Sequence, residues 1–229
     1  MKISFDIISD LRLTEESKFT WEDNVTSLFC IVAGNLSDDS KVIQKTLSYL
    51  STLYQGIFYI DGSLEHPEIT SRLEKVAELD KICRSINNTV YLHNNVIVMN
   101  GIGIVAVNGW YGNYPVKELG DDLLTEAYRR EDMIYLYNTL KKLQLHVDVK
   151  NILVVSNSVP NKSLYFHEIE GFIDNFCPTL TLEADTEKKV KTWIFGTYNK
   201  KVDISRENIN FVANPKIEKE PYFPKRIEI

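Results

Sequence analysis

The sequence predicts a layered α/β domain built on a mixed β-sheet, or on two such sheets packed face to face. Strand-like and helix-like segments alternate in the first half, while hairpin signals dominate the second. No internal repeat and no linker rich in Gly, Pro or Ser divides the 229 residues. We therefore expect one domain over residues 1–229, long enough to bury a substantial core.

The first half contains three apolar runs, each followed by a polar turn, which predict buried strands: Ile3–Ile8, Leu28–Ala33 and Ile57–Ile60. Between the last two runs, Ser37–Asp39 offers N-cap candidates for a helix that extends to about Tyr54. Pro67 fits the first turn of a second helix, which runs to about Ile86.

In the second half, Val90–Met99 and Ile102–Trp110 read as strands joined by Asn100-Gly101, a strong hairpin signal. A long helix is expected from about Asp121 to Gln144. Three more strands are predicted after it: Ile152–Ser156, Thr192–Phe195 and Ile209–Ala213.

Composition excludes several functional classes. The formal net charge of -6 gives no general attraction to nucleic acid or to anionic membranes. No signal peptide is recognisable, and no segment approaches the roughly 20 apolar residues of a membrane span. Cys30, Cys83 and Cys177 lie far apart without a C-x-x-C spacing, which indicates neither a zinc knuckle nor a disulfide framework. We expect a cytoplasmic protein.

The segment V-K-T-W-I-F-G-T-Y-N, at Val190–Asn199, resembles the last metal-binding loop of the calcineurin-like metallophosphoesterases, W-x-F-G-H-x-H. Thr197 and Asn199 stand where that family has two histidines. I-I-S-D-L-R-L, which begins at Ile7, is similar to the family's S-D-x-H: Asp10 is kept and Arg12 replaces the histidine.

Three further motifs follow in the family's order. V-A-G-N-L-S-D-D resembles G-D-x-x-D, with Asn35 in place of the aspartate that bridges both metals. Y-I-D-G-S-L-E-H corresponds to G-N-H-E, with Ser63 at the asparagine ligand and Leu64 at the catalytic histidine. L-V-V-S-N-S-V-P resembles the S-H-x-x-P strand end, with Asn157 replacing a histidine ligand.

The resemblance covers nearly the whole chain, and the tail, at Asn214–Lys216 and Pro224–Ile229, is similar to the ends of small bacterial and phage members. It implies a four-layer α/β/β/α sandwich with two mixed sheets. It also implies a former active site at the strand ends, where α/β folds gather their catalytic residues.

The family's chemistry needs two divalent cations roughly 3.5–4 Å apart, held by several anionic or imidazole ligands. Among the matched positions only Asp10 would bind a metal strongly, and Arg12 would add a permanent cation. The sequence thus predicts a protein without metal, cofactor or phosphatase activity. Its former site is expected to persist as a polar network centred on an Asp10–Arg12 pair.

The resemblance favours a role in protein interaction or assembly, as for the phosphoesterase-like subunit of retromer and the accessory subunits of replicative polymerases. A phage-encoded structural or host-modulating component, in the host cytoplasm or the virion, fits the same pattern. Trp110, Tyr111 and Tyr114 form an aromatic segment that would either pack under its loop or anchor a partner protein.

Two other hypotheses remain open. Arg12, near the mouth of an emptied site, would bind a phosphate-containing ligand such as a nucleotide. Residual hydrolysis would instead use a nonstandard metal site, with His66 beside Asp10 or Asp38 as ligands. Neither nucleic acid nor a membrane is an expected partner.

Overall fold

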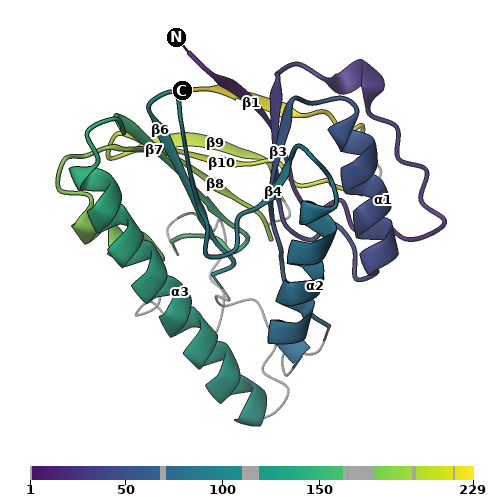
Figure 1. Cartoon of the computed structure of the whole chain (residues 1–229), viewed down its shortest axis with the longest axis horizontal. Helices are drawn as coiled ribbons and strands as arrows, with labels where there is room; N and C mark the ends of the chain where they lie inside the picture. Colours follow the sequence, from purple (N-terminus) through teal and green to yellow (C-terminus); the bar gives the residue numbers. More distant parts are fainter. Residues whose placement is uncertain are drawn as a thin grey trace.

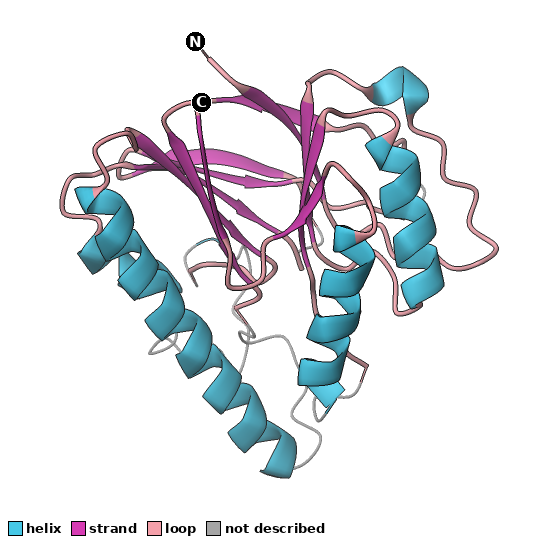
Figure 2. Cartoon of the chain, in the orientation of Figure 1, coloured by secondary structure: helices cyan, strands magenta, loops and turns pink. Residues whose placement is uncertain are grey.

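The computed structural model describes residues 2–67, 71–109, 119–161, 164, 178–197, 200–218 and 220–229. Two mixed β-sheets lie face to face, and helices cover both outer sides (Figures 1 and 2). The protein is therefore the four-layer α/β/β/α sandwich that the resemblance implies.

The first sheet has the strand order β11-β1-β2-β3-β4. Its strands are β1 (Ser4–Ile8), β2 (Phe29–Ala33), β3 (Gly56–Ile60), β4 (Thr89–Tyr91) and β11 (Lys225–Glu228). The first four are parallel to their neighbours, and β11 joins β1 antiparallel, so the end of the chain lies beside its beginning.

The second sheet has the order β5-β6-β7-β8-β10-β9. Its strands are β5 (Val96–Met99), β6 (Ile102–Val107), β7 (Asn151–Ser156), β8 (Val190–Phe195), β9 (Val202–Arg206) and β10 (Ile209–Ala213). The four central strands are parallel, and the edge strands β5 and β9 are antiparallel to their neighbours.

Helices α1 (Ser40–Ser51) and α2 (Arg72–Arg84) pack on the outer face of the first sheet. The long helix α3 (Leu119–Leu145) and the 3-10 segment η5 (Pro178–Ala184) pack on the second, while η1 (Glu22–Asn24) is a short 3-10 turn before β2. No helix in the described part of the chain is long and apolar enough to cross a bilayer.

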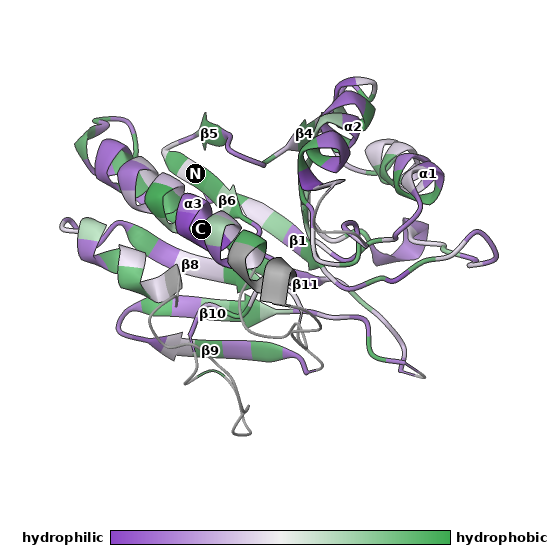
Figure 3. Cartoon of the chain, turned by 90° about the horizontal axis from the view of Figure 1, so that it is seen from below, coloured by the Kyte–Doolittle hydropathy of each residue, from purple (hydrophilic) through white to green (hydrophobic). Residues whose placement is uncertain are grey.

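A buried apolar layer fills the space between the two sheets. Phe5 and Ile31 of the first sheet and Ile104, Leu153 and Ile194 of the second are all fully buried there. Because the central strands are covered on both faces, they carry nearly continuous hydrophobic runs (Figure 3). Burial of each such side chain contributes about 1.5–3 kcal/mol, which makes this layer the main link between the sheets.

Local capping and turn chemistry match the sequence in two places. The side chain of Asp39, one of the predicted N-caps, accepts a hydrogen bond of 2.7 Å from the Lys41 backbone N–H at the start of α1. Asn100 and Gly101 have φ values of 48° and 84°, the positive values that a tight two-residue hairpin requires. Both predictions are confirmed.

The second helix begins later than predicted. Pro67 does not lie in its first turn, since α2 starts after Ser71. Residues 63–66 instead close a turn, in which the His66 backbone N–H donates to the Ser63 carbonyl at 3.2 Å.

The predicted strand Val90–Met99 is wrong as a single element. Its first part is β4 in one sheet and its last part is β5 in the other. The chain crosses between the sheets through a turn in which the Asn95 N–H donates to the Leu92 carbonyl, with Asn94 at a φ of 49°. The short strands β9 and β11, which carry many polar residues, gave too weak a pattern to be predicted.

Candidate functional site

Polar side chains from both sheets meet where five parallel strands end. Asp10 follows β1, Asn35 follows β2 and Ser63 follows β3, while Asn157 follows β7 and Thr197 follows β8. Hydrogen bonds join these five residues directly. We call this set the rim; the structure places these five of the motif-matched positions together at one edge.

The Asn35 side chain is the centre of the rim. Its Nδ2 donates to Asp10 Oδ1 at 2.8 Å and to Thr197 Oγ1 at 3.1 Å. Its Oδ1 accepts hydrogen bonds from the Ser63 hydroxyl at 3.2 Å and from the Leu64 backbone N–H at 2.9 Å. Both donors and the acceptor oxygen of this buried amide are therefore used.

Asn157 closes the network from the second sheet. Its Oδ1 accepts from the Thr197 hydroxyl at 2.6 Å and from the Ser63 backbone N–H at 3.3 Å. Its Nδ2 donates to the Ala33 carbonyl at 3.2 Å, at the end of a strand in the first sheet. The two asparagines thus tie the sheets together by side-chain hydrogen bonds.

Two glycines show how closely these amides pack against the backbone. A Cβ atom at Gly34 would lie 2.4 Å from Asn157 Nδ2, and one at Gly62 would lie 2.4 Å from Asn35 Oδ1. Such separations are far below ordinary van der Waals contact. Gly34 also has a φ of 77°, a conformation that disfavours other residues.

The Asp10 carboxylate is buried and faces hydrogen-bond donors. Its Oδ1 accepts from Asn35 Nδ2, and both of its oxygens lie 3.1 Å from the Thr197 backbone N–H. Burial raises the pKa of Asp10 to about 6, although the hydrogen bond from Asn35 opposes this shift. The N–H groups of Asn35 and Thr197 thus supply the hydrogen bonds that the carboxylate accepts within the rim.

The described residues of the rim do not fit a pair of bridged divalent cations. Such a centre needs several carboxylate or imidazole ligands, whereas the rim supplies one carboxylate, two amides and two hydroxyls. Over the described part of the chain, no group of three or more His, Cys, Asp or Glu side chains has an arrangement that could hold a metal ion. Asn199 lies outside the described residues.

The predicted Asp10–Arg12 pair is wrong. Arg12 is exposed, and the ion pairs found among the described residues do not include one between these two side chains. The Arg12 backbone N–H donates to the Asn35 carbonyl at 3.0 Å, and the charge of its side chain lowers the pKa of Asp10 without a direct ion pair. A guanidinium keeps its hydration at the surface, and Asp10 already has N–H partners, so burial of an ion pair would bring no gain.

Glu65, which the motif analysis did not select, holds the loops after β2 and β3 together. Its buried carboxylate accepts from the backbone N–H groups of Leu36, Gly62 and Asn35 at 2.7, 2.9 and 3.1 Å. The Tyr59 hydroxyl adds a fourth bond at 3.0 Å. Burial raises the pKa of Glu65 to about 7 despite these donors.

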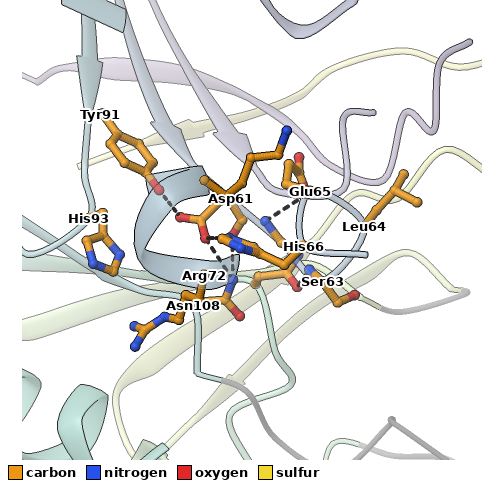
Figure 4. A network of polar contacts seen from close by, with 12 residues as sticks. Asp61, Ser63, Leu64, Glu65, His66, Arg72, Tyr91, His93 and Asn108 are labelled. Carbon is orange, nitrogen blue, oxygen red and sulfur yellow. Dashed lines mark hydrogen bonds and ion pairs between the residues drawn. The ribbon is translucent and has the colours of Figure 1, made fainter. Parts of the chain in front are cut away.

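Asp61 is the centre of a second buried network beside the rim (Figure 4). It accepts from the Tyr91 hydroxyl at 2.6 Å and from Asn108 Nδ2 at 3.1 Å, and His66 Nε2 lies 2.6 Å from Oδ2. Burial alone would raise the pKa of Asp61, but His66 and the other partners hold it well below its usual range. His66 therefore contacts Asp61, and not Asp10 or Asp38 as the alternative metal site would require.

The sequence contains a signal for these missed residues. Asp61 directly follows a strand of continuous apolar residues and Glu65 lies in the turn after it, so carboxylates at this place are buried by their neighbours and need partners. The tyrosine and amide partners come from other elements and had no signal of their own. Trp110, Tyr111 and Tyr114 lie outside the described residues.

The fold is shared with solved structures of low sequence identity. Phosphopantetheinyl hydrolase from Mycobacterium tuberculosis aligns with a TM-score of 0.65 and 13% identity, over 99% of this chain and 96% of its own. An assigned 5′-nucleotidase from Staphylococcus aureus aligns with a TM-score of 0.56 and 11% identity, over 94% of this chain and 49% of its own. GAP50, the anchor in the inner membrane complex of Plasmodium, gives 0.53 and 12%, over 93% and 71%.

No family model and no curated protein matches the sequence. The structural neighbours have metallophosphoesterase-type folds, which confirms the predicted fold class. At identities this low, the likeness establishes the fold alone.

Replacement of Arg12 and of Asn157 should affect stability very differently. Arg12→Ala removes an exposed side chain and is expected to change the free energy of unfolding by less than about 0.5 kcal/mol. Asn157→Ala leaves the Thr197 hydroxyl and the Ser63 N–H without their acceptor, at a cost of about 2–3 kcal/mol. Urea denaturation measures both. If Arg12→Ala lowered the free energy of unfolding more than Asn157→Ala, the result would support an Asp10–Arg12 ion pair after all.

Asp10→Asn should stabilise the protein at pH 8. Because the folded-state pKa of about 6 lies above the unfolded value of 3.8, Asp10 contributes stability when protonated and loses it as the pH rises through 6. An asparagine keeps an acceptor oxygen for the Asn35 and Thr197 donors without the charge. We expect a gain of about 1–3 kcal/mol at pH 8 that vanishes near pH 4, measured by urea denaturation. A variant less stable than the parent at pH 8 would contradict a raised pKa of Asp10 in the folded protein.

Proposed function

We propose that this chain is a catalytically inactive metallophosphoesterase-like protein that acts as a protein-interaction or assembly module. The observation that supports the proposal is the Asn35 amide, which donates to both Asp10 and Thr197 at the centre of the rim. A neutral amide in this place does not offset the charge of two cations, and its N–H groups face the single carboxylate.

The rest of the rim supports the same conclusion. Leu64 lies at the position that corresponds to the family's catalytic histidine, and its side chain can neither donate nor accept a proton. The hydroxyls of Ser63 and Thr197 are both engaged with asparagine side chains. In this proposal the rim stabilises the fold, and selection for a phosphoesterase site no longer acts on it.

The interaction role also rests on the resemblance to non-catalytic members of the wider family. An aromatic partner anchor at Trp110, Tyr111 and Tyr114, a phage origin, and a location in the host cytoplasm or virion belong to this proposal as expectations from the sequence. The alternative, in which Arg12 near the mouth of the former site binds a phosphate-containing ligand, stays a second proposal; Arg12 is exposed there.

The metal content of protein purified without chelator tests the first part of the proposal. We expect no stoichiometric metal by elemental analysis and no manganese binding by calorimetry. A variant that restores three of the family's ligands and its catalytic histidine, Asn35→Asp/Leu64→His/Asn157→His/Thr197→His, is the positive control. It should bind manganese at least 100-fold more tightly than the parent, because carboxylate and imidazole ligands replace amides and hydroxyls.

Stoichiometric manganese, iron or zinc in the parent protein would overturn the proposal. Metal-dependent hydrolysis of bis(p-nitrophenyl) phosphate by the parent, abolished by Asp10→Ala, would establish residual phosphoesterase activity instead. Thermal melting of the restored variant shows whether it is folded before its metal binding is compared.

A further inference from the structure

A groove of about 720 Å³ lies between the loop of residues 13–20 and α1. The loop runs beside α1 at the edge of the molecule (Figure 1, purple). The groove's volume falls within the range of about 300–1,000 Å³ that is typical of ligand sites. None of the five rim residues lines it, so it is a separate feature.

Part of the groove has an apolar and aromatic lining. Leu13 and Phe19 from the loop and Val42 and Tyr49 from α1 supply the apolar part. The Phe19 ring stacks on Trp21, with ring centroids 5.5 Å apart, and meets Tyr49 edge-on at 6.0 Å. An apolar side chain of a ligand would therefore contact aromatic rings that are already in place.

Hydrogen bonds at both ends hold the loop wall in position. The Leu13 backbone N–H donates to the Leu36 carbonyl at 2.8 Å. At the other end the Trp21 backbone N–H donates to the Tyr49 hydroxyl, and the indole Nε1 donates to Tyr54, both at 2.7 Å. A wall fixed in this way lowers the ordering cost of binding.

The charge of the groove is opposite to that of the whole chain. Its lining contains three lysines and one acidic residue: Lys18, Lys41, Lys45 and Glu15. The lining therefore has a net charge of +2, whereas the formal net charge of the whole chain is -6. All three lysines are exposed, and the ion pairs found among the described residues involve none of them. These ammonium groups are available to a negatively charged ligand.

We propose that this groove binds an acidic peptide segment of a partner protein, with an apolar side chain on the aromatic lining and carboxylates at the lysines. The inference rests on the proposed interaction role and specifies the partner's chemistry. From Lys41 to Tyr49 the lining of α1 extends about 12 Å at 1.5 Å per residue, which matches about four residues of an extended peptide.

The arrangement of the positive charges favours a peptide over a phosphate group. Lys41 and Lys45 lie one helical turn apart on α1, and Lys18 lies on the loop, so the charges are distributed along two walls. The described lining contains no arginine fork, the group best suited to bidentate contact with a phosphate. Several separate carboxylates along a peptide fit this distribution better than one compact anion.

Fluorescence anisotropy with a fluorescein-labelled peptide, Glu-Glu-Phe-Glu-Glu, tests the proposal on the full chain. Lys41→Glu/Lys45→Glu should weaken binding at least tenfold. The matched control, Lys81→Glu/Lys142→Glu, makes the same charge change at exposed helix positions away from the groove and should alter affinity less than twofold. Peptides with Gln for every Glu, or Gly for Phe, should each bind at least fivefold more weakly.

Several results would overturn the proposal. These are no binding of the peptide, equal effects of the two lysine variants, or equal binding of the Gln peptide. Displacement of the peptide by equimolar pyrophosphate would identify a phosphate site instead. None of these outcomes changes the metal content of the protein, so failure here is distinguishable from failure of the proposed loss of catalysis.

Discussion

The side-chain amide of Asn35 is the interaction on which the rest of the rim depends. It joins the loop after β2 to Asp10 after β1 and to Thr197 after β8, and so connects the two sheets. Its side-chain oxygen accepts a hydrogen bond from the Leu64 N–H and so holds the loop after β3 in place. Because the amide is buried, its donors and acceptor must all be satisfied within the protein, and this requirement sets the positions of the neighbouring loops.

A rim of amides solves an electrostatic problem that a metal-free rim of carboxylates would face. Clustered carboxylates repel each other unless cations neutralise them, whereas asparagine is close in size to aspartate and carries no charge. The protein still buries Asp10 and Glu65, whose pKa values are raised to about 6 and about 7. Each is retained with N–H donors around it, and Asp61 nearby is held ionised by His66.

The fold class and the clustering of the rim residues could be predicted from the sequence, because both predictions depend on local signals. An apolar run followed by a polar turn marks a strand end, and in a parallel sheet such ends share one edge. Where two sheets compete for one apolar run, as in Val90–Met99, the local signal cannot decide the pairing. The exposure of Arg12 was equally hidden, since the N–H donors to Asp10 come from Asn35 and Thr197, which are far from it in the sequence.

By itself the sequence determined the buried strands β1, β2, β3, β6, β7, β8 and β10, the turn at Asn100-Gly101 and the chemical types at the rim. These are properties of short segments, fixed by hydrophobic period and backbone preference. Only the tertiary structure decided that Glu65 ties two loops together and that Phe19 and Tyr49 line one groove. Those contacts join residues far apart in the chain, and their free energy arises from desolvation and geometry that exist only after the sheets have packed.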